Sequence, residues 1–210
     1  MTSRQVFWGV PVFIWLLFTF WYTDFGGPLS EAEVAEGITL LAADNYDAER
    51  LAEIEAFLRR DTGRQFLMVN NIDMNETPPE MPGFGPDAKA SALMDHYMEH
   101  MYKELLKRAC HPIFFGTGLG IVVDLEGVDG PAASGWDSAA LFRYRSRRSL
   151  LEVITHPQMQ ERHAYKLAAL TKTIAYPVEP RLYVSDLRFI LFLVLGLVAA
   201  FIDNLFFRRR

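Results

Sequence analysis

Long apolar runs lie at the two ends of the chain, and shorter periodic patterns lie between them. Residues 6–22 read VFWGVPVFIWLLFTFWY, without a charge, and residues 189–207 form a second apolar run. An α-helix rises about 1.5 Å per residue, so helices over 5–23 and 188–207 approach the ~30 Å thickness of the hydrocarbon core of a bilayer. The pattern therefore predicts a transmembrane helix at each end of the chain.

The first end segment could be a cleaved signal peptide, and the second contains two polar residues. The first segment has the position of a signal peptide, but no pair of small residues follows it for a peptidase to recognise, so we expect it to be retained as an anchor. Asp203 and Asn204 lie one turn before the terminal arginines. We interpret them as a polar pair at the membrane interface rather than as a proton relay.

The charges that flank the end segments predict their orientation. Residues 23–49 contain no lysine or arginine and seven acidic residues, whereas Arg4 precedes the first segment and three arginines, 208–210, follow the second. Positively charged flanks stay in the cytoplasm. We therefore expect a bacterial inner-membrane protein with both termini in the cytoplasm and residues 24–186 in the periplasm.

Residues 30–61 have the pattern of two short helices. Ser30 and Glu33 form a capping box that starts the first helix. Asp44 is expected to cap the second helix, which ends at Arg60. We interpret this segment as a helical spacer between the membrane and the main domain.

From residue 64 to residue 180 the pattern changes to β, α, β, β, α, β, which predicts an α+β domain. A loop rich in proline and glycine, residues 77–89, precedes the first helix of this domain. That helix has an apolar face with Tyr97 and Met101 and a polar face with His96 and His100. The expected strands are 65–74, 113–125, 139–145 and 173–178, and the expected helices are 91–109 and 146–171, the second interrupted at His156-Pro157.

The second half of this domain resembles a known family. It is similar to an uncharacterised ferredoxin-like family of the dimeric α/β-barrel superfamily, close to the antibiotic-biosynthesis monooxygenases, and the strand FLMVNNIDM is similar to the family's first strand. The resemblance covers residues 64–180 and neither the anchors nor residues 30–60. The positions that carry it are Trp136, Asp137, Arg143, Tyr144, Ser146, Arg147, Pro157, His163 and Ala168-Ala169-Leu170.

The resemblance implies a βαββαβ fold and a homodimer whose two sheets close into a barrel. It implies no reaction, because that branch has no assigned activity. The long loop 77–89 departs from the family pattern.

Composition and charge exclude several classes of protein. The chain has 210 residues, half of them hydrophobic, and Cys110 is its only cysteine, which excludes a disulfide-stapled miniprotein. Residues 24–186 contain 16 basic and 25 acidic residues, a net charge of −9. An acidic domain argues against nucleic acid, and against an anionic membrane surface, as its partner.

His163, Arg143 and Asp137 are the catalytic candidates. His163 shares a helical stripe with Met159 and Leu167, so we expect it to point inward, either as a core residue or as an acid–base group. Arg143 lies on the same strand face as Arg145, and the two are placed to clamp a carboxylate; the alternative is a structural ion pair with Asp137.

Asn70 and three glycines are the candidates for ligand binding. Gly116, Gly118 and Gly120 alternate in an expected strand, which leaves one face bare. That face is either the floor of a ligand cavity or a place of close packing, and the second is favoured.

No metal and no cofactor are predicted from the sequence. His96 and His100 have the spacing that lets two imidazoles share a metal, but the pattern places both on a solvated helix face. The segment after the glycines is another expected strand, which excludes a dinucleotide-binding loop.

Three functions remain open, and with them the question of whether the protein is an enzyme. The favoured hypothesis is an accessory or assembly subunit of a membrane protein complex, because two anchors flank a small domain without a strong catalytic constellation. The alternative is a membrane-tethered, cofactor-independent oxygenase or isomerase that acts on a lipophilic small molecule. The third is a protein that binds such a ligand and hands it on.

Overall fold

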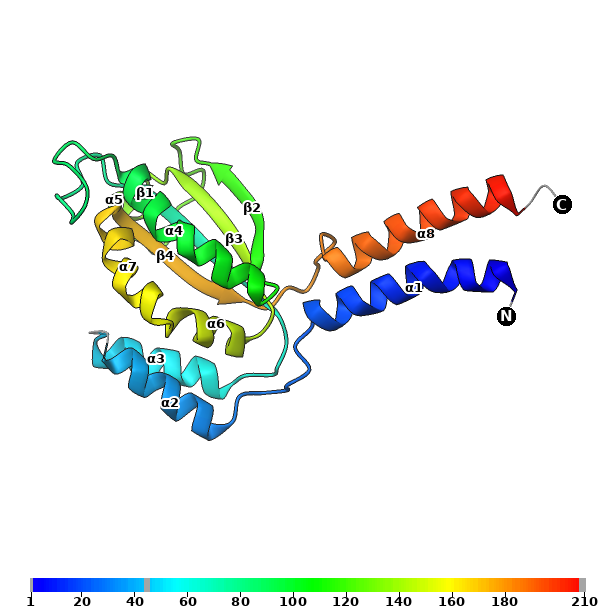
Figure 1. The fold of residues 1–210 in the computed structure, drawn as a ribbon. Helices are drawn as coiled ribbons and strands as arrows, with labels where there is room; N and C mark the ends of the chain where they lie inside the picture. The colour runs from blue at the N-terminus through cyan, green and yellow to red at the C-terminus, as the bar shows by residue number, and fades with distance from the viewer. Residues whose placement is uncertain (1, 44–45, 208–210) are drawn as a thin grey trace. The chain divides into compact units, whose positions relative to one another are not determined.

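The computed structural model describes residues 2–43 and 46–207, which form two compact units (Figure 1). One unit contains both ends of the chain, up to Asp24 and from Pro180 onwards, and the other contains Phe25–Glu179. The order of elements alternates helices and strands only in the second unit, which is therefore the α+β part of the chain.

The terminal unit is a pair of helices, α1 (Ser3–Tyr22) and α8 (Leu187–Phe206). Each has the length and the apolar composition needed to cross a bilayer, in agreement with the prediction. Arg4 binds Asp203 through two hydrogen bonds of 2.8 and 2.5 Å, so the start of α1 lies beside the end of α8 and the helices are antiparallel. The arginines at 208–210, on which the predicted orientation depends, lie outside the described residues.

The second unit is built on a four-stranded antiparallel sheet in the order β2-β3-β1-β4. Helix α4 (Ala90–Lys107) connects β1 to β2, and helices α6 (Arg147–Ile154) and α7 (Pro157–Ala168) connect β3 to β4. Phe66 and Tyr144 of the sheet stack at 5.2 Å and form part of the core with Leu105 of α4. The strands are β1 (Phe66–Met74), β2 (His111–Thr117), β3 (Ser138–Tyr144) and β4 (Leu170–Val178).

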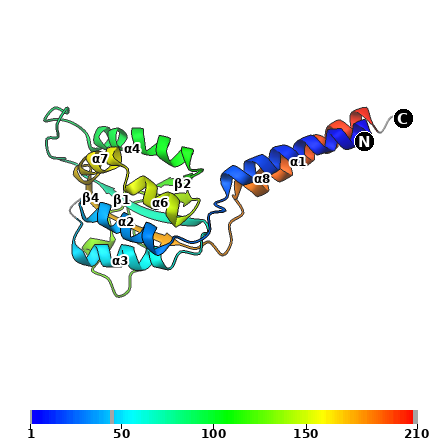
Figure 2. The same ribbon diagram turned by 60° about the horizontal axis from the view of Figure 1, so that its bottom comes forward.

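Helices α2 (Glu31–Ala42) and α3 (Ala48–Arg59) belong to the same compact unit as the sheet. Their buried leucines pack with Leu151 of α6, so these two helices, which the sequence predicts as a spacer, contribute to the core of this unit (Figure 2). The expected capping box between Ser30 and Glu33 is present. The cap of α3 is Asp47 and not the expected Asp44, which lies outside the described residues.

Two residues highlighted by the family resemblance hold α6 in place. The buried Ser146 caps the helix by accepting a hydrogen bond from the backbone N–H of Ser149. Arg147 lies 4.3 Å from the centre of the Phe57 ring and donates a hydrogen bond to the Phe57 carbonyl. Arg147 therefore ties α6 to α3.

The expected strand 113–125 is wrong in its second half, because β2 ends at Thr117. The backbone of Gly118 approaches that of Trp136 so closely that no side chain fits there, and Gly120 has a φ of +76°, which ends the extended conformation. Residues 118–128 form a loop in which Leu119 and Val123 are each 92% exposed. A short helix, α5 (Gly130–Ala133), follows that the sequence pattern did not predict.

Candidate functional site

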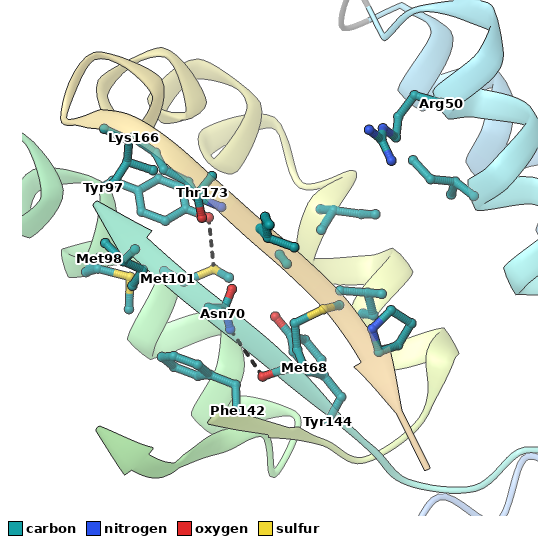
Figure 3. A pocket seen from close by; sticks show the side chains of 18 of the residues that line it. Arg50, Met68, Asn70, Tyr97, Met98, Met101, Phe142, Tyr144, Lys166 and Thr173 are labelled. Atoms are coloured by element: carbon teal, nitrogen blue, oxygen red, sulfur yellow. Dashed lines mark hydrogen bonds between the residues drawn. The ribbon is translucent and has the colours of Figure 1, made fainter. Parts of the chain in front are cut away.

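The helical face of the sheet holds the site with the clearest binding character, a pocket of about 570 Å³ (Figure 3). Strands place alternate residues on one face, so Met68, Asn70 and Ile72 of β1 all face it. Helices α3, α4, α6 and α7 close the other sides. The lining residues are Tyr46, Arg50, Glu53, Ile54, Phe57, Met68, Asn70, Ile72, Met94, Tyr97, Met98, Met101, Phe142, Tyr144, Leu150, Ile154, Lys166, Leu170, Thr173, Ile174, Ala175 and Pro177.

The wall of the pocket is mainly apolar and rich in methionine. Four methionines, residues 68, 94, 98 and 101, contribute to it together with the aromatic rings of Phe142 and Tyr144. Methionine side chains are unbranched and polarisable, so they adapt to ligands of different shape. Such a wall fits an apolar molecule.

Few polar groups reach this wall. The amide nitrogen of Asn70 donates to the carbonyl oxygens of Met68 at 3.1 Å and Ala140 at 3.4 Å, which fixes its side chain (Figure 3). The Tyr97 hydroxyl donates to the Met101 sulfur at 3.9 Å. Burial raises the pKa of Tyr97, so this hydroxyl keeps its proton and can donate either to the Met101 sulfur or to a ligand.

Lys166 of α7 is a basic group at the Tyr97 end of the pocket. Its Nζ lies 5.7 Å from the centre of the Tyr97 ring, and burial lowers its pKa. In the part of the chain that the structure describes, no acidic side chain pairs with it. Arg50 lies away from Lys166, on α3 (Figure 3), where it pairs with Glu53.

Of the residues selected from the sequence, Asn70 is in the pocket and Arg143 is not. Arg143 is fully buried and faces away from the pocket, since its strand neighbours Phe142 and Tyr144 line it. Its guanidinium donates to Gln65 Oε1 at 2.9 and 2.7 Å and to the Ala109 carbonyl at 2.6 Å. These contacts make Arg143 a structural residue.

Asp137 and His163 also lie outside the lining of the pocket. The carboxylate of Asp137 accepts a hydrogen bond from the Met74 backbone N–H at 2.7 Å, which joins the start of β3 to the end of β1. The His163 ring stacks on Tyr46 at 6.2 Å. Helix α7 is rotated relative to the expected stripe, because Lys166 faces the pocket while Leu167 is exposed.

None of the three glycines lines the pocket on the helical face of the sheet. Gly116 is in β2, where the Phe114 ring lies over it, and Gly118 and Gly120 follow the strand. The alternation on which the ligand hypothesis depends therefore ends after the first glycine. Close packing, the favoured alternative, fits Gly116 and Gly118.

The hydrophobic pattern predicts Tyr97 and Met101 on an apolar helix face but does not distinguish Lys166 as a site residue. A single lysine on an amphipathic helix is normally solvated, and nothing in its spacing distinguishes it. Its position becomes visible only when α7 is packed against β4 and α4.

No protein-family model and no curated protein matches the chain. Among solved structures, it is similar to a protein of unknown function from Rhodopseudomonas palustris, with 14% identity and a TM-score of 0.52 over 66% of this chain and 97% of that chain. A methylated form of that protein matches at 15% identity and a TM-score of 0.52, over 68% of this chain and 96% of that chain. These matches indicate a shared fold and carry no activity.

Proposed function

We propose that the protein is a membrane-anchored binder of a lipophilic small molecule that carries an acidic group. The observation that carries this proposal is the apolar pocket of about 570 Å³ with Lys166 in its wall and no acidic partner for that lysine among the described residues. The volume lies within the roughly 300–1,000 Å³ typical of small-molecule sites.

The charge of Lys166 argues for an acidic ligand. An ammonium group among apolar side chains loses solvation, and an anionic group of a ligand would replace the lost water. The neighbouring Tyr97 hydroxyl is placed to orient the same ligand. The methionine-rich wall would hold its apolar part.

Binding fits the site better than catalysis. His163, Arg143 and Asp137, which the sequence offered as catalytic residues, do not converge, and two of them are engaged by backbone groups. A pocket with one charged group and an apolar wall matches a protein that holds a ligand and hands it on. The membrane anchors would keep that protein near ligands dissolved in lipid.

The domain also fits the proposed relationship with ferredoxin-like proteins of the dimeric α/β-barrel type. Strand order β2-β3-β1-β4 with helices between β1 and β2 and between β3 and β4 supports it. For the chain as a whole we propose termini in the cytoplasm and residues 24–186 in the periplasm of a bacterial inner membrane, on the basis of the flanking charges.

A second candidate function is that of a subunit in a homodimer or a larger membrane complex. The sheet face opposite the pocket carries an apolar row that runs in register across all four strands, from Phe114 through Leu141 and Val69 to Tyr176. Phe114 is 52% exposed and Tyr176 is 45% exposed. An exposed apolar row of this kind favours contact with another protein surface.

Photo-crosslinking with a long-chain fatty acid that carries a diazirine tests the ligand proposal on the full-length protein in its own membranes. We expect labelled peptides from β1 and α4, competition by unlabelled fatty acid, and weaker competition by its methyl ester. Lys166→Met should reduce labelling, whereas Lys103→Met, on the exposed face of α4, should not. Labelling that is equal in both variants, or that is confined to α1 and α8, would refute the proposal.

Native mass spectrometry of the untagged protein after gentle extraction tests the second candidate. A dimer or larger assembly that dissociates in Phe114→Asp or Tyr176→Asp would support it. A wild-type protein that is monomeric in these conditions would count against it.

A further inference from the structure

We propose that His100, Glu104 and His156 form a binding site for a divalent transition-metal ion of the zinc class. One donor atom from each residue lies within 4.8 Å of the others. None of the three residues lines the pocket, so this inference stands independently of the proposed ligand.

Two separate segments bring these residues together. His100 and Glu104 are four residues apart on α4, so both project from the same side of that helix. His156 is the N-cap of α7, at the break where Pro157 starts the helix after α6 has ended. The His100 and His156 rings lie 5.1 Å apart between their centres.

Both imidazoles present a buried nitrogen without a partner. Among the described residues, neither Nε2 of His100 nor Nδ1 of His156 makes a hydrogen bond, and both atoms are inaccessible to solvent. A buried polar atom without a partner destabilises a folded protein, so two of them at one place require an explanation. A shared metal ion would engage both lone pairs at once.

Glu104 provides a carboxylate that is already held in position. It is 3% exposed, and its Oε2 accepts a hydrogen bond from Arg108 Nη1 at 2.6 Å. Arg108 is itself bound to Glu152 at 2.6 Å. Arg108 thus has the role that outer groups take in metal sites, where they orient the coordinating carboxylate.

The other oxygen of Glu104 faces the histidines. Oε1 lies 3.9 Å from Nε2 of His100 and accepts a hydrogen bond from Lys107 at 2.5 Å. The Lys107 side chain is 67% exposed, so it can turn into solvent and leave Oε1 to a metal ion. Arg108 remains hydrogen-bonded to Oε2 of Glu104 when Lys107 moves away.

The charges near the site suit a cation. Glu104 is held as a carboxylate by Arg108 and Lys107, and it becomes the uncompensated negative charge of the site when Lys107 turns into solvent. The nearby charges largely balance, because Arg162 pairs with Glu99 and Arg108 with Glu152.

The donor set identifies the class of metal. Two imidazoles and one carboxylate, with a fourth position left for water, are typical of zinc sites, in which the metal–ligand bonds are about 2.0–2.2 Å. Donors on such a tetrahedron are roughly 3.3 Å apart, so donor atoms that now lie up to 4.8 Å apart must approach by up to about 1.5 Å through side-chain rotation. Calcium and magnesium are disfavoured because they require oxygen ligands.

Cobalt and zinc titrations of the untagged, full-length protein in detergent, after chelator treatment, test the site. We expect one Co²⁺ per chain with visible absorption bands of tetrahedral type, displaced by Zn²⁺. His100→Gln and His156→Gln should each weaken binding at least tenfold. His96→Gln should leave binding unchanged, because the His96 ring contacts Tyr165 and Phe84 instead.

A second measurement uses only the wild-type protein and is therefore independent of the folding of any variant. X-ray absorption at the zinc edge of the Zn²⁺-loaded protein should show two imidazole nitrogens and one carboxylate bound directly to the metal. A wild-type protein that binds no Co²⁺ or Zn²⁺ would overturn the proposal. Equal affinity in wild type and His156→Gln, or a bound zinc ion without imidazole ligands, would overturn it as well.

Discussion

Replacing Arg143 with methionine distinguishes a structural arginine from a ligand clamp. The side chain is fully buried and makes two hydrogen bonds to Gln65 and one to the carbonyl of Ala109. Ala109 follows the end of α4 in a left-handed conformation, with a φ of +54°. Arg143 therefore fixes the point where the chain leaves α4 and enters β2.

The cost of this substitution follows from the groups that lose their donors. Methionine retains most of the apolar stem, so little packing is lost. The Ala109 carbonyl would be left buried without its charged donor, which costs about 1–3 kcal/mol, and hydrogen bonds from charged groups contribute about 1.5–3 kcal/mol each. Gln65 is partly exposed and can turn towards water. We therefore expect a loss of about 3–5 kcal/mol in the free energy of unfolding.

Thermal unfolding of the full-length protein, followed by near-UV circular dichroism, measures this loss. A domain of this size should lose roughly 10 °C in its midpoint. Arg50→Met is the matched control, because Arg50 is 62% exposed in its pair with Glu53 and should cost less than about 1 kcal/mol. If Arg143→Met unfolds like wild type but no longer binds the fatty-acid probe, the structural assignment is refuted and Arg143 is a ligand residue.

Three further predictions concern the anchors, the α2–α6 contact and acid stability. Cysteines placed at Phe7 and Phe207, whose rings lie 5.6 Å apart, should be joined by a short flexible bis-maleimide crosslinker, and Asp203→Asn should reduce the yield of this crosslink. Gly37→Val should lower the free energy of unfolding by about 1–3 kcal/mol, because an added side chain there meets a buried leucine of α6. Wild-type protein treated with a chelator should lose stability as pH falls from 4.5 towards 2, because the pKa of Glu104 is about 2 in the folded protein and ordinarily 4.5. Glu104→Gln should reduce this loss, which is measured as the unfolding midpoint at a series of pH values.

The sequence predicted the elements of the fold wherever local signals were strong. The charge-free run 6–22 and the capping box at Ser30 place α1 and α2 to within a few residues. The end of β2 was missed because residues 113–125 remain apolar beyond Thr117. What ends the strand there is a close approach between two backbone segments, and such a contact leaves no periodic signal.

The candidate site was less predictable, because it depends on how helices are rotated against the sheet. His163 and Lys166 are three residues apart, so a small error in the rotation of α7 exchanges one for the other. His156 was recognised only as a helix break, since its partners His100 and Glu104 lie on a helix distant in sequence. Residues that share a helix can be grouped from spacing, whereas residues that meet across two helices cannot.

Helix α4 connects the two proposed sites. Tyr97 and Met101 line the pocket, while His100 and Glu104 lie on the adjacent side of the same helix. A metal ion that joined α4 to His156 would fix the start of α7, and α7 carries Lys166 into the pocket wall. Metal binding should then strengthen retention of an acidic ligand without touching it, so Zn²⁺ should increase fatty-acid labelling of wild type and leave that of His156→Gln unchanged.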